Sequence, residues 1–257
     1  MRNAVWTLTV SALLTAASAQ IDYQEQGDAG DLPATAQLVS AADAQPCQTP
    51  VQSIRGQMDE DDVDMFVICI TDPATFSAST VGTTSWDTQL WLFRCDGIGV
   101  VHNDDNPDGG GLGSRIDNRT NCIQRPGIYL LAISRYNRDP VTADGLMLWD
   151  LLGNNRAVRC PDGPRADEPV GAWAGATQAA GEYLILLTGA YAVSENGCCV
   201  TAGGDVDLNG CVDDADLLRI LIAFGNTGQF LPEDVTCDGV VDDADLLTVL
   251  SAFGSGC

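Results

Sequence analysis

Two acidic segments near the C-terminal end of the 257-residue chain have the residue types and the spacing of a calcium-binding loop. Residues 205–216 read DVDLNGCVDDAD, and residues 234–245, which begin 29 positions later, read DVTCDGVVDDAD. Both carry side-chain oxygens at loop positions 1, 3, 5, 9 and 12 and a glycine at position 6, where the loop turns sharply. One acidic turn arises easily by chance, but two in register do not. The repeat therefore predicts two calcium sites.

Five side-chain oxygens and one backbone carbonyl would hold the ion in each loop, because calcium prefers about six to eight oxygen ligands. The predicted ligands of the first loop are Asp205, Asp207, Asn209, the carbonyl of Cys211, Asp213 and Asp216. Those of the second loop are Asp234, Thr236, Asp238, the carbonyl of Val240, Asp242 and Asp245. Asp213 and Asp242 stand at position 9, which often binds through a water molecule. Because the carboxylates of an empty loop repel one another, we expect metal binding and folding of this segment to be coupled.

Each loop leads into a predicted amphipathic helix. The apolar residues follow i, i+3, i+4, i+7 spacing, and we expect the two stripes to bury each other. The stripes are Leu217, Ile220, Leu221 and Phe224 in the first helix, and Leu246, Val249, Leu250 and Phe253 in the second. Gly225 and Gly254 stand where a helix ends in a left-handed residue. Glycine or proline precedes each loop, so no entering helix is expected.

The segment from about residue 203 to residue 257 resembles a type I dockerin, the duplicated calcium-loop module that docks on cohesin domains. The resemblance implies a cohesin-like partner, recognised by loop positions 10 and 11 and by exposed helix residues. Those positions are Asp214 and Ala215 in one copy and Asp243 and Ala244 in the other. Identical copies imply binding in two orientations related by a half-turn. Two departures are Thr236 at position 3 and the Asp-Ala pair in place of the usual hydroxyl pair.

The first 19 residues have the features of a secretory signal peptide. Arg2 supplies the positive start, residues 4–17 are mostly apolar, and a small-residue cleavage site ends at Ala19. A membrane-spanning helix is the alternative, but the apolar stretch is short and no later segment is long enough to span a bilayer. We therefore expect a secreted or cell-surface protein without membrane insertion.

Ten cysteines in an exported chain predict disulfide bonds. A pair between Cys95 and Cys122 would bracket a loop between two strands. The five cysteines Cys198, Cys199, Cys211, Cys237 and Cys257 would connect the C-terminal segment to itself or to the rest of the chain. Zinc is disfavoured because the chain has no Cys-x-x-Cys pair and a single histidine.

The formal net charge of −24 narrows the range of partners. All twelve basic residues are arginine, against 36 acidic residues. Such a surface repels nucleic acid and anionic membranes, so neither is an expected partner.

Residues 20–196 are predicted to be mainly β. Strong strand patterns occur at 64–70, 88–94, 127–134 and 181–187, each bounded by turn residues. In the second, Leu90 and Leu92 alternate with Trp91 and Phe93, so the two pairs point to opposite faces. We expect a disulfide-bonded, jelly-roll-like β-sandwich, with residues 137–181 decorating one edge, followed by a small α-helical module with duplicated calcium loops over residues 197–257.

This body resembles the bacterial pre-peptidase C-terminal domain, a secreted β-sandwich found beside catalytic domains. The similarity rests on residues 54–66 (IRGQMDEDDVDMF), 87–93 (DTQLWLF), 103–106 (NDDN) and 126–131 (PGIYLL). In that family the domain is an accessory rather than the catalyst, which implies that this chain is not an enzyme.

Three other sites are possible in the body. His102 is the only candidate base for a hydrolase, and its position near a strand end favours a solvated turn. A further calcium site would form if two acidic segments met at one end of the sandwich, although solvated turns are the alternative; they are Asp59, Asp61, Asp62 and Asp64, and Asp104, Asp105 and Asp108. Six aromatic residues would suit a sugar-stacking platform, although core packing also explains them: Trp86, Trp91, Trp149, Trp173, Tyr129 and Tyr136.

The sequence therefore favours an exported, non-catalytic protein attached through calcium to a surface or secreted partner. A carbohydrate-binding accessory of an extracellular polysaccharide-degrading system is the second hypothesis, with polysaccharide as the partner. A secreted hydrolase is the third, and it would need two paired carboxylates that the sequence does not single out.

Overall fold

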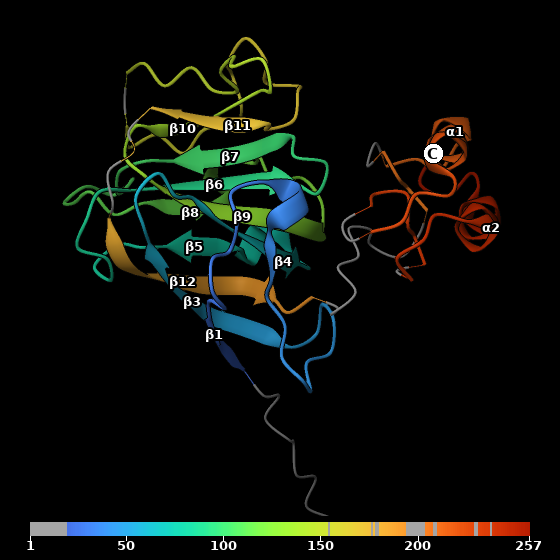
Figure 1. Cartoon of the computed structure of the whole chain (residues 1–257), viewed down its shortest axis with the longest axis horizontal. Helices are drawn as coiled ribbons and strands as arrows, with labels where there is room; N and C mark the ends of the chain where they lie inside the picture. Colours follow the sequence, from blue (N-terminus) through green and yellow to red (C-terminus); the bar gives the residue numbers. More distant parts are fainter. Residues whose placement is uncertain are drawn as a thin grey trace, which may run out of the picture.

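The computed structural model describes residues 20–153, 155–175, 177, 180–193, 204–207, 210–228, 231–236 and 238–257. The described part is mainly β, followed by a small helical part at the C-terminal end (Figure 1). The predicted signal peptide lies outside the described residues.

The strands match the sequence patterns closely. They are β1 (Ile21–Gln24), β2 (Gln37–Leu38), β3 (Pro50–Met58), β4 (Asp64–Ile70), β5 (Ser77–Ser79), β6 (Thr88–Arg94), β7 (Gly99–Asn103), β8 (Arg115–Asp117), β9 (Gly127–Arg135), β10 (Arg138–Val141), β11 (Ala172–Gly175) and β12 (Gly181–Tyr191). Short 3-10 turns occur at Pro33–Thr35, Pro73–Thr75 and Asn118–Thr120. The helices are α1 (Asp214–Ala223) and α2 (Asp243–Ala252). The four predicted strands are thus β4, β6, β9 and β12, and β12 extends beyond its predicted end.

Apart from a separate two-stranded sheet of β10 and β11, the strands form two layers that share β12. The first part of β12 pairs with β3, its middle pairs with β5, and β1 and β8 extend this layer. The pairing of β12 with β3 is irregular between Leu186 and Ala190, after which Ala190 and Tyr191 pair with both β3 and β4. From β4 the second layer continues through β9 and β6 to β7, all antiparallel. One strand therefore connects both layers of the sandwich.

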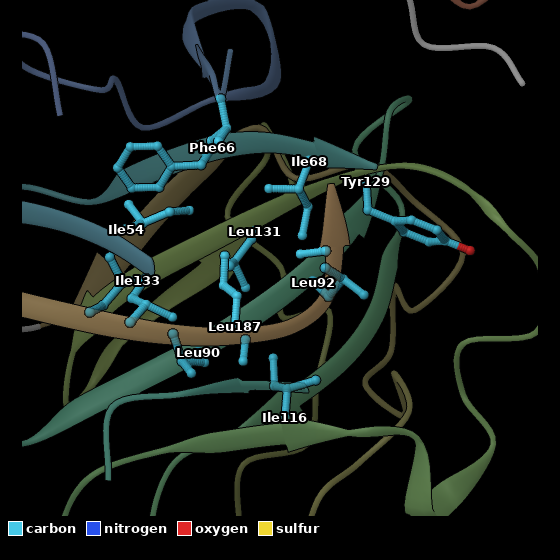
Figure 2. Close-up of a cluster of buried hydrophobic side chains, with 14 of the residues drawn as sticks. Ile54, Phe66, Ile68, Leu90, Leu92, Ile116, Tyr129, Leu131, Ile133 and Leu187 are labelled. Atoms are coloured by element: carbon cyan, nitrogen blue, oxygen red, sulfur yellow. The ribbon is translucent and has the colours of Figure 1, made fainter. Parts of the chain in front are cut away.

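The main core lies between the two layers. It contains Ile54 of β3 and Leu187 of β12 facing Phe66 of β4, Leu92 of β6 and Leu131 of β9, as Figure 2 shows. These side chains are buried, with Ile54, Phe66, Leu92 and Leu131 at 0% exposure. Closing the two sheets over this cluster removes a large apolar area from water and stabilises the sandwich.

A second core covers the other face of β4, β6 and β9. Trp91 and Phe93 of β6 point into it and pack against Trp149 and Trp173. The predicted alternation along β6 is confirmed, because Leu90 and Leu92 lie in the main core instead. The prediction that residues 137–181 decorate an edge is wrong. This segment supplies both tryptophans and covers a sheet face, since the apolar outer face of β6 must also be buried.

Disulfides connect the loops of the sandwich. Cys47 bonds to Cys69, and Cys122 bonds to Cys160. The predicted Cys95–Cys122 pair is therefore wrong, and Cys95 is bonded to a different cysteine. The reason is that the segment around Cys160 crosses beside the loop before β9, a proximity that strand spacing does not reveal. In the C-terminal part Cys211 bonds to Cys257, which confirms an internal pair there. Cys198, Cys199 and Cys237 lie outside the described residues.

The two helices pack side by side at the C-terminal end of the chain (Figure 1). Their buried residues are Ile220 and Ala223 in α1 and Val249 in α2, with Leu217 and Leu246 partly buried. In each helix, therefore, only two of the four apolar residues predicted to be buried are buried or partly buried. The remaining stripe residues are about half exposed: Leu221 56%, Phe224 50%, Leu250 49% and Phe253 52%. The correct buried spacing is i, i+3, i+6, because valines of the loops cover that side of each helix.

Candidate metal centres

The first predicted calcium loop brings three of its carboxylates together. One oxygen from each of Asp205, Asp207 and Asp216 lies within 4.8 Å of the others. Asp205 Oδ1 is buried and accepts no hydrogen bond within the described residues, and burial raises the pKa of this carboxyl. An unpartnered buried oxygen facing two other carboxylates fits a hard cation such as calcium.

Asp216, at loop position 12, organises the loop from inside. It is 0% exposed, and its Oδ1 accepts hydrogen bonds from the backbone N–H groups of Val206 and Asp207 at 2.6 and 3.0 Å. Its Oδ2 accepts one from the N–H of Asp213 at 2.9 Å. These bonds hold the start and the end of the loop around one carboxylate even without an ion.

The second loop repeats this arrangement with the same number of carboxylates at different loop positions. Asp245 is also 0% exposed and accepts from the N–H groups of Thr236 and Asp242 at 2.9 and 2.8 Å. Asp234 is 3% exposed and accepts from the N–H groups of Asp238 and Gly239 at 3.1 and 2.8 Å. Within the described residues this loop forms no equally close group of three carboxylates. Position 3 explains the difference, since a threonine hydroxyl replaces the carboxylate.

The remaining predicted ligands occupy the loop edges. Asp213 and Asp242 cap the helices, each accepting a hydrogen bond at 2.8 Å from the N–H two residues later. Asp238 is exposed and accepts from the N–H of Val240 at 3.0 Å. Cys211 carries the disulfide to Cys257, and its carbonyl is the predicted ligand rather than its sulfur. Asn209 lies outside the described residues.

Glycine is required at position 6 of both loops. Gly210 has φ of +95° and Gly239 has φ of +86°, a left-handed conformation that side chains disfavour. At Gly210 a side chain would also meet the sandwich, since a Cβ there would lie 2.7 Å from Nη2 of Arg125. Arg125 is 3.4 Å from Asp205 through its Nη1, and Arg94 donates to the carbonyl of Asp207 at 3.4 Å. Two arginines of the sandwich thus contact the first loop.

The two loops are joined by a symmetric exchange of backbone hydrogen bonds. Val212, at position 8 of the first loop, accepts from Gly254 and donates to Ser255, both just after α2. Val241, at position 8 of the second loop, accepts from Gly225 and donates to Asn226, both just after α1. Each loop is therefore held by the end of the opposite helix, and the two sites share one core.

The predicted partner-binding residues lie on the surface of the helices. Asp214, Ala215, Asp243 and Ala244 are all exposed in the first helical turns. Beyond them, exposed apolar residues occupy equivalent positions on both helices, including Leu218 and Leu247 at 57% and 62% exposure. Both copies therefore present the same acidic turn followed by two equivalent exposed leucines, whereas exposed Ile222 of α1 is replaced by Ser251 in α2.

The acidic segments of the sandwich form two separate groups instead of the single predicted site. One group consists of Asp28, Asp62 and Asp64, and the other of Asp87, Asp104 and Asp105. Asp61 and Asp108 belong to neither, because their carboxylates pair with Arg138 and with two arginines of the β8 region, respectively. Sequence reasoning missed Asp28 and Asp87. For Asp87 the available signal was its position directly before β6, whose hairpin partner β7 is followed by acidic residues.

His102 is a buried strand residue rather than the predicted solvated turn residue. It is 4% exposed in β7 and stacks on Trp91 with a ring-centroid distance of 3.8 Å. Burial lowers the pKa of His102 to about 3, so the imidazole is neutral at neutral pH. In the antiparallel pairing of β6 with β7, His102 lies opposite Trp91, which belongs to the second core.

Core packing, the favoured interpretation of the aromatic residues, is confirmed for most of them, and they do not form a sugar-stacking platform. Trp91, Trp149, Trp173 and Tyr129 are 8% exposed or less and belong to the two cores. Among the six aromatic residues only Tyr136 is strongly exposed, at 45%. Rings buried on both faces cannot stack on a sugar.

Comparison of the chain with protein-family models and with curated proteins gives no match in either case. Within the described residues, no helix is both long enough and apolar enough to cross a membrane.

Proposed function

We propose that this is an exported, non-catalytic calcium-binding protein whose C-terminal helical part attaches it to a surface or secreted protein. The observation that carries the proposal is the duplicated surface of α1 and α2. Each helix begins with an exposed Asp-Ala pair and continues into exposed leucines, directly above a loop whose carboxylates point inward. Exposed apolar side chains gathered on a small folded unit favour a protein-binding site.

Calcium would control this surface because the loops form the helix N-termini. Asp213 and Asp242 are at once predicted ligands and helix caps. An ion that neutralises the carboxylates below the helices would stabilise the first turns that carry Asp214 and Asp243. Attachment should therefore be lost when calcium is chelated.

The chemistry of the surface defines the partner. An apolar centre flanked by two carboxylates suits a protein with an apolar patch and nearby donor or basic groups. A cohesin-like domain is the partner that the dockerin resemblance suggests. The duplication favours two binding orientations, because both helices begin with the same five residues, Asp-Ala-Asp-Leu-Leu, although exposed Ile222 of α1 corresponds to Ser251 of α2.

Two features support a non-catalytic role for the sandwich. Its single histidine is buried against Trp91, and burial lowers its pKa to about 3, so it is a weak base that is out of reach of a bound substrate. Most of the remaining aromatic residues are used in packing.

The test is calcium-dependent capture with matched variants. The full chain is immobilised and exposed to exported proteins of the source organism in calcium and in EDTA, and the captured protein is then purified for affinity measurements. We expect capture in calcium alone. Leu218→Glu and Leu247→Glu should each have a small effect, because the other orientation remains, whereas the double variant should lose binding. Leu152→Glu alters an exposed leucine of the sandwich, 83% exposed, and should bind normally. Equal capture by the double variant and by Leu152→Glu would refute the proposed surface.

A further inference from the structure

The open end of the β6–β7 hairpin carries a group of acidic residues that the C-terminal loops do not explain. Asp87 immediately precedes β6, and Asp104 and Asp105 immediately follow β7. The two strands are antiparallel with Leu90 opposite Asn103, which brings these ends together. One carboxylate oxygen from each of the three lies within 4.8 Å of the others.

Asp104 is the buried member of this group and lacks a partner. It is 4% exposed, and its Oδ1 accepts no hydrogen bond within the described residues. Oδ1 of Asp87 is likewise buried without a hydrogen bond. Buried polar atoms in native proteins are nearly always satisfied, and a buried carboxylate without a donor is costly. These two buried oxygens are thus short of hydrogen-bond donors, although Arg135 lies close enough to Asp87 to favour its charged form.

The surroundings of Asp104 add more negative charge. Burial is the largest cause that raises the pKa of Asp104 to about 8, followed by the neighbouring carboxylates of Asp87, Asp105 and Asp139. The other acidic group differs in this respect. Neither oxygen of Asp64 has a partner of good hydrogen-bond geometry, but the hydroxyl of Tyr183 and the carboxyl of Glu25 lie close enough to interact with it, whereas the neighbouring groups that act on the pKa of Asp104 are all acidic.

A cavity beside Asp104 also has space for water molecules that would complete the coordination of an ion. Asp104 is the member of the group that lines a cavity of about 60 Å³, whose other polar lining includes His102, Tyr136, Asp139, Asn155 and Arg159. A water molecule occupies about 10–15 Å³ of such volume, so the cavity has room for several water ligands.

We propose that Asp87, Asp104 and Asp105 form a calcium site in the sandwich, separate from the two C-terminal loops. Calcium is the fitting ion because the group offers carboxylate oxygens and no sulfur or imidazole ligand. The ion ties the start of β6 to the end of β7. It also steadies two further segments, because Tyr136 donates its N–H to the carbonyl of Asp87 at 3.0 Å and Asp105 donates its N–H to Asn155 at 2.9 Å.

Terbium luminescence separates this site from the C-terminal loops. Tb³⁺ replaces Ca²⁺ and emits when a nearby tryptophan is excited. Residues 204–257 contain no tryptophan or tyrosine, whereas Trp86 adjoins Asp87 in the chain. Excitation of tryptophan in the full chain therefore reports ions bound to the sandwich. We expect a sensitised signal that calcium displaces.

Matched variants show which carboxylates bind the Tb³⁺ ion that gives the signal. Asp104→Asn keeps the shape of the side chain and should lose the signal. Asp108→Asn, at an exposed acid in the following loop, and Asp64→Asn, in the other acidic group, should retain it. The proposal is overturned if the wild type gives no sensitised signal, if Asp104→Asn retains it, or if Asp64→Asn loses it instead.

Thermal melting followed by tryptophan fluorescence gives an independent readout. In EDTA, Asp104→Asn should melt above the wild type, because it removes a buried carboxyl that has no hydrogen-bond partner and lies among other acidic groups. In calcium the order should reverse, because the variant has lost a ligand. This EDTA measurement also shows that the variant is folded. The same order of melting in both conditions would contradict a calcium site at Asp104.

Discussion

Replacing Asp216 with alanine should open α1 even in the absence of calcium. The carboxylate of Asp216 accepts three backbone N–H groups, those of Val206, Asp207 and Asp213, and it is fully buried. A donor left without a partner costs about 1–3 kcal/mol, with the lower end appropriate where water can reach it. Of the three bonds only that of Val206 is fully buried. The expected loss is therefore about 3 kcal/mol, which corresponds to about a hundredfold increase in the population of the open state.

Hydrogen exchange of the full chain in EDTA, read by mass spectrometry on peptides that cover α1, measures this opening. Asp214→Ala is the matched control, because Asp214 is exposed and contributes only about 0.3–1 kcal/mol through the helix dipole. Asp216→Asn should be intermediate, since one oxygen can still accept from Val206 and Asp207 while the amide faces the N–H of Asp213.

The second loop provides an internal comparison. Asp245 accepts two backbone N–H groups rather than three, so Asp245→Ala should cost about 2 kcal/mol at α2. If α1 exchanges no faster in Asp216→Ala than in Asp214→Ala, Asp216 does not organise the loop and the reasoning fails.

Three further predictions concern the sandwich. Replacing Cys122 and Cys160 together by alanine should lower the free energy of unfolding by about 4 kcal/mol, the chain-entropy value for their sequence separation of 38, and unchanged urea denaturation would contradict it. Because the pKa of His102 is lowered to about 3, its imidazole NMR signals should not titrate between about pH 8 and pH 5. The unfolded chain binds this proton near pH 6.5, so the contribution of His102 to stability declines as the pH falls below that value. Burial raises the pKa of Asp64 to about 9, so in EDTA the folded state retains a proton that the unfolded state releases near pH 4. Stability should decline as the pH rises from about 4 to 9, and Asp64→Asn should flatten that decline; an equally steep decline in the variant would show that another group causes it.

The sequence was most informative where burial imposes a simple period. β6 was predicted residue for residue because both faces are apolar and the strand keeps strict alternation, so Leu90 and Trp91 could be assigned to opposite sides. The helical stripes were less certain. A ten-residue helix allows two neighbouring faces, and the valines of the loops, rather than the helix pattern, decided that Ala223 is buried and Phe224 exposed.

Contacts between segments that are far apart in the chain could not be predicted from the sequence. The pairing of Cys122 with Cys160 depends on how residues 137–175 fold back over β6. The meeting of Asp87 with Asp104 depends on the register of β6 against β7. The candidate calcium site combined Asp104 with Asp59–Asp64 because both segments are acidic. A similar composition, however, does not show that two segments lie close together in the fold.

The disulfide between Cys211 and Cys257 turns the second half of the first loop, both helices and the second loop into one covalent ring. A single proteolytic cut between α1 and α2 would therefore leave the two halves of the docking surface on the same molecule.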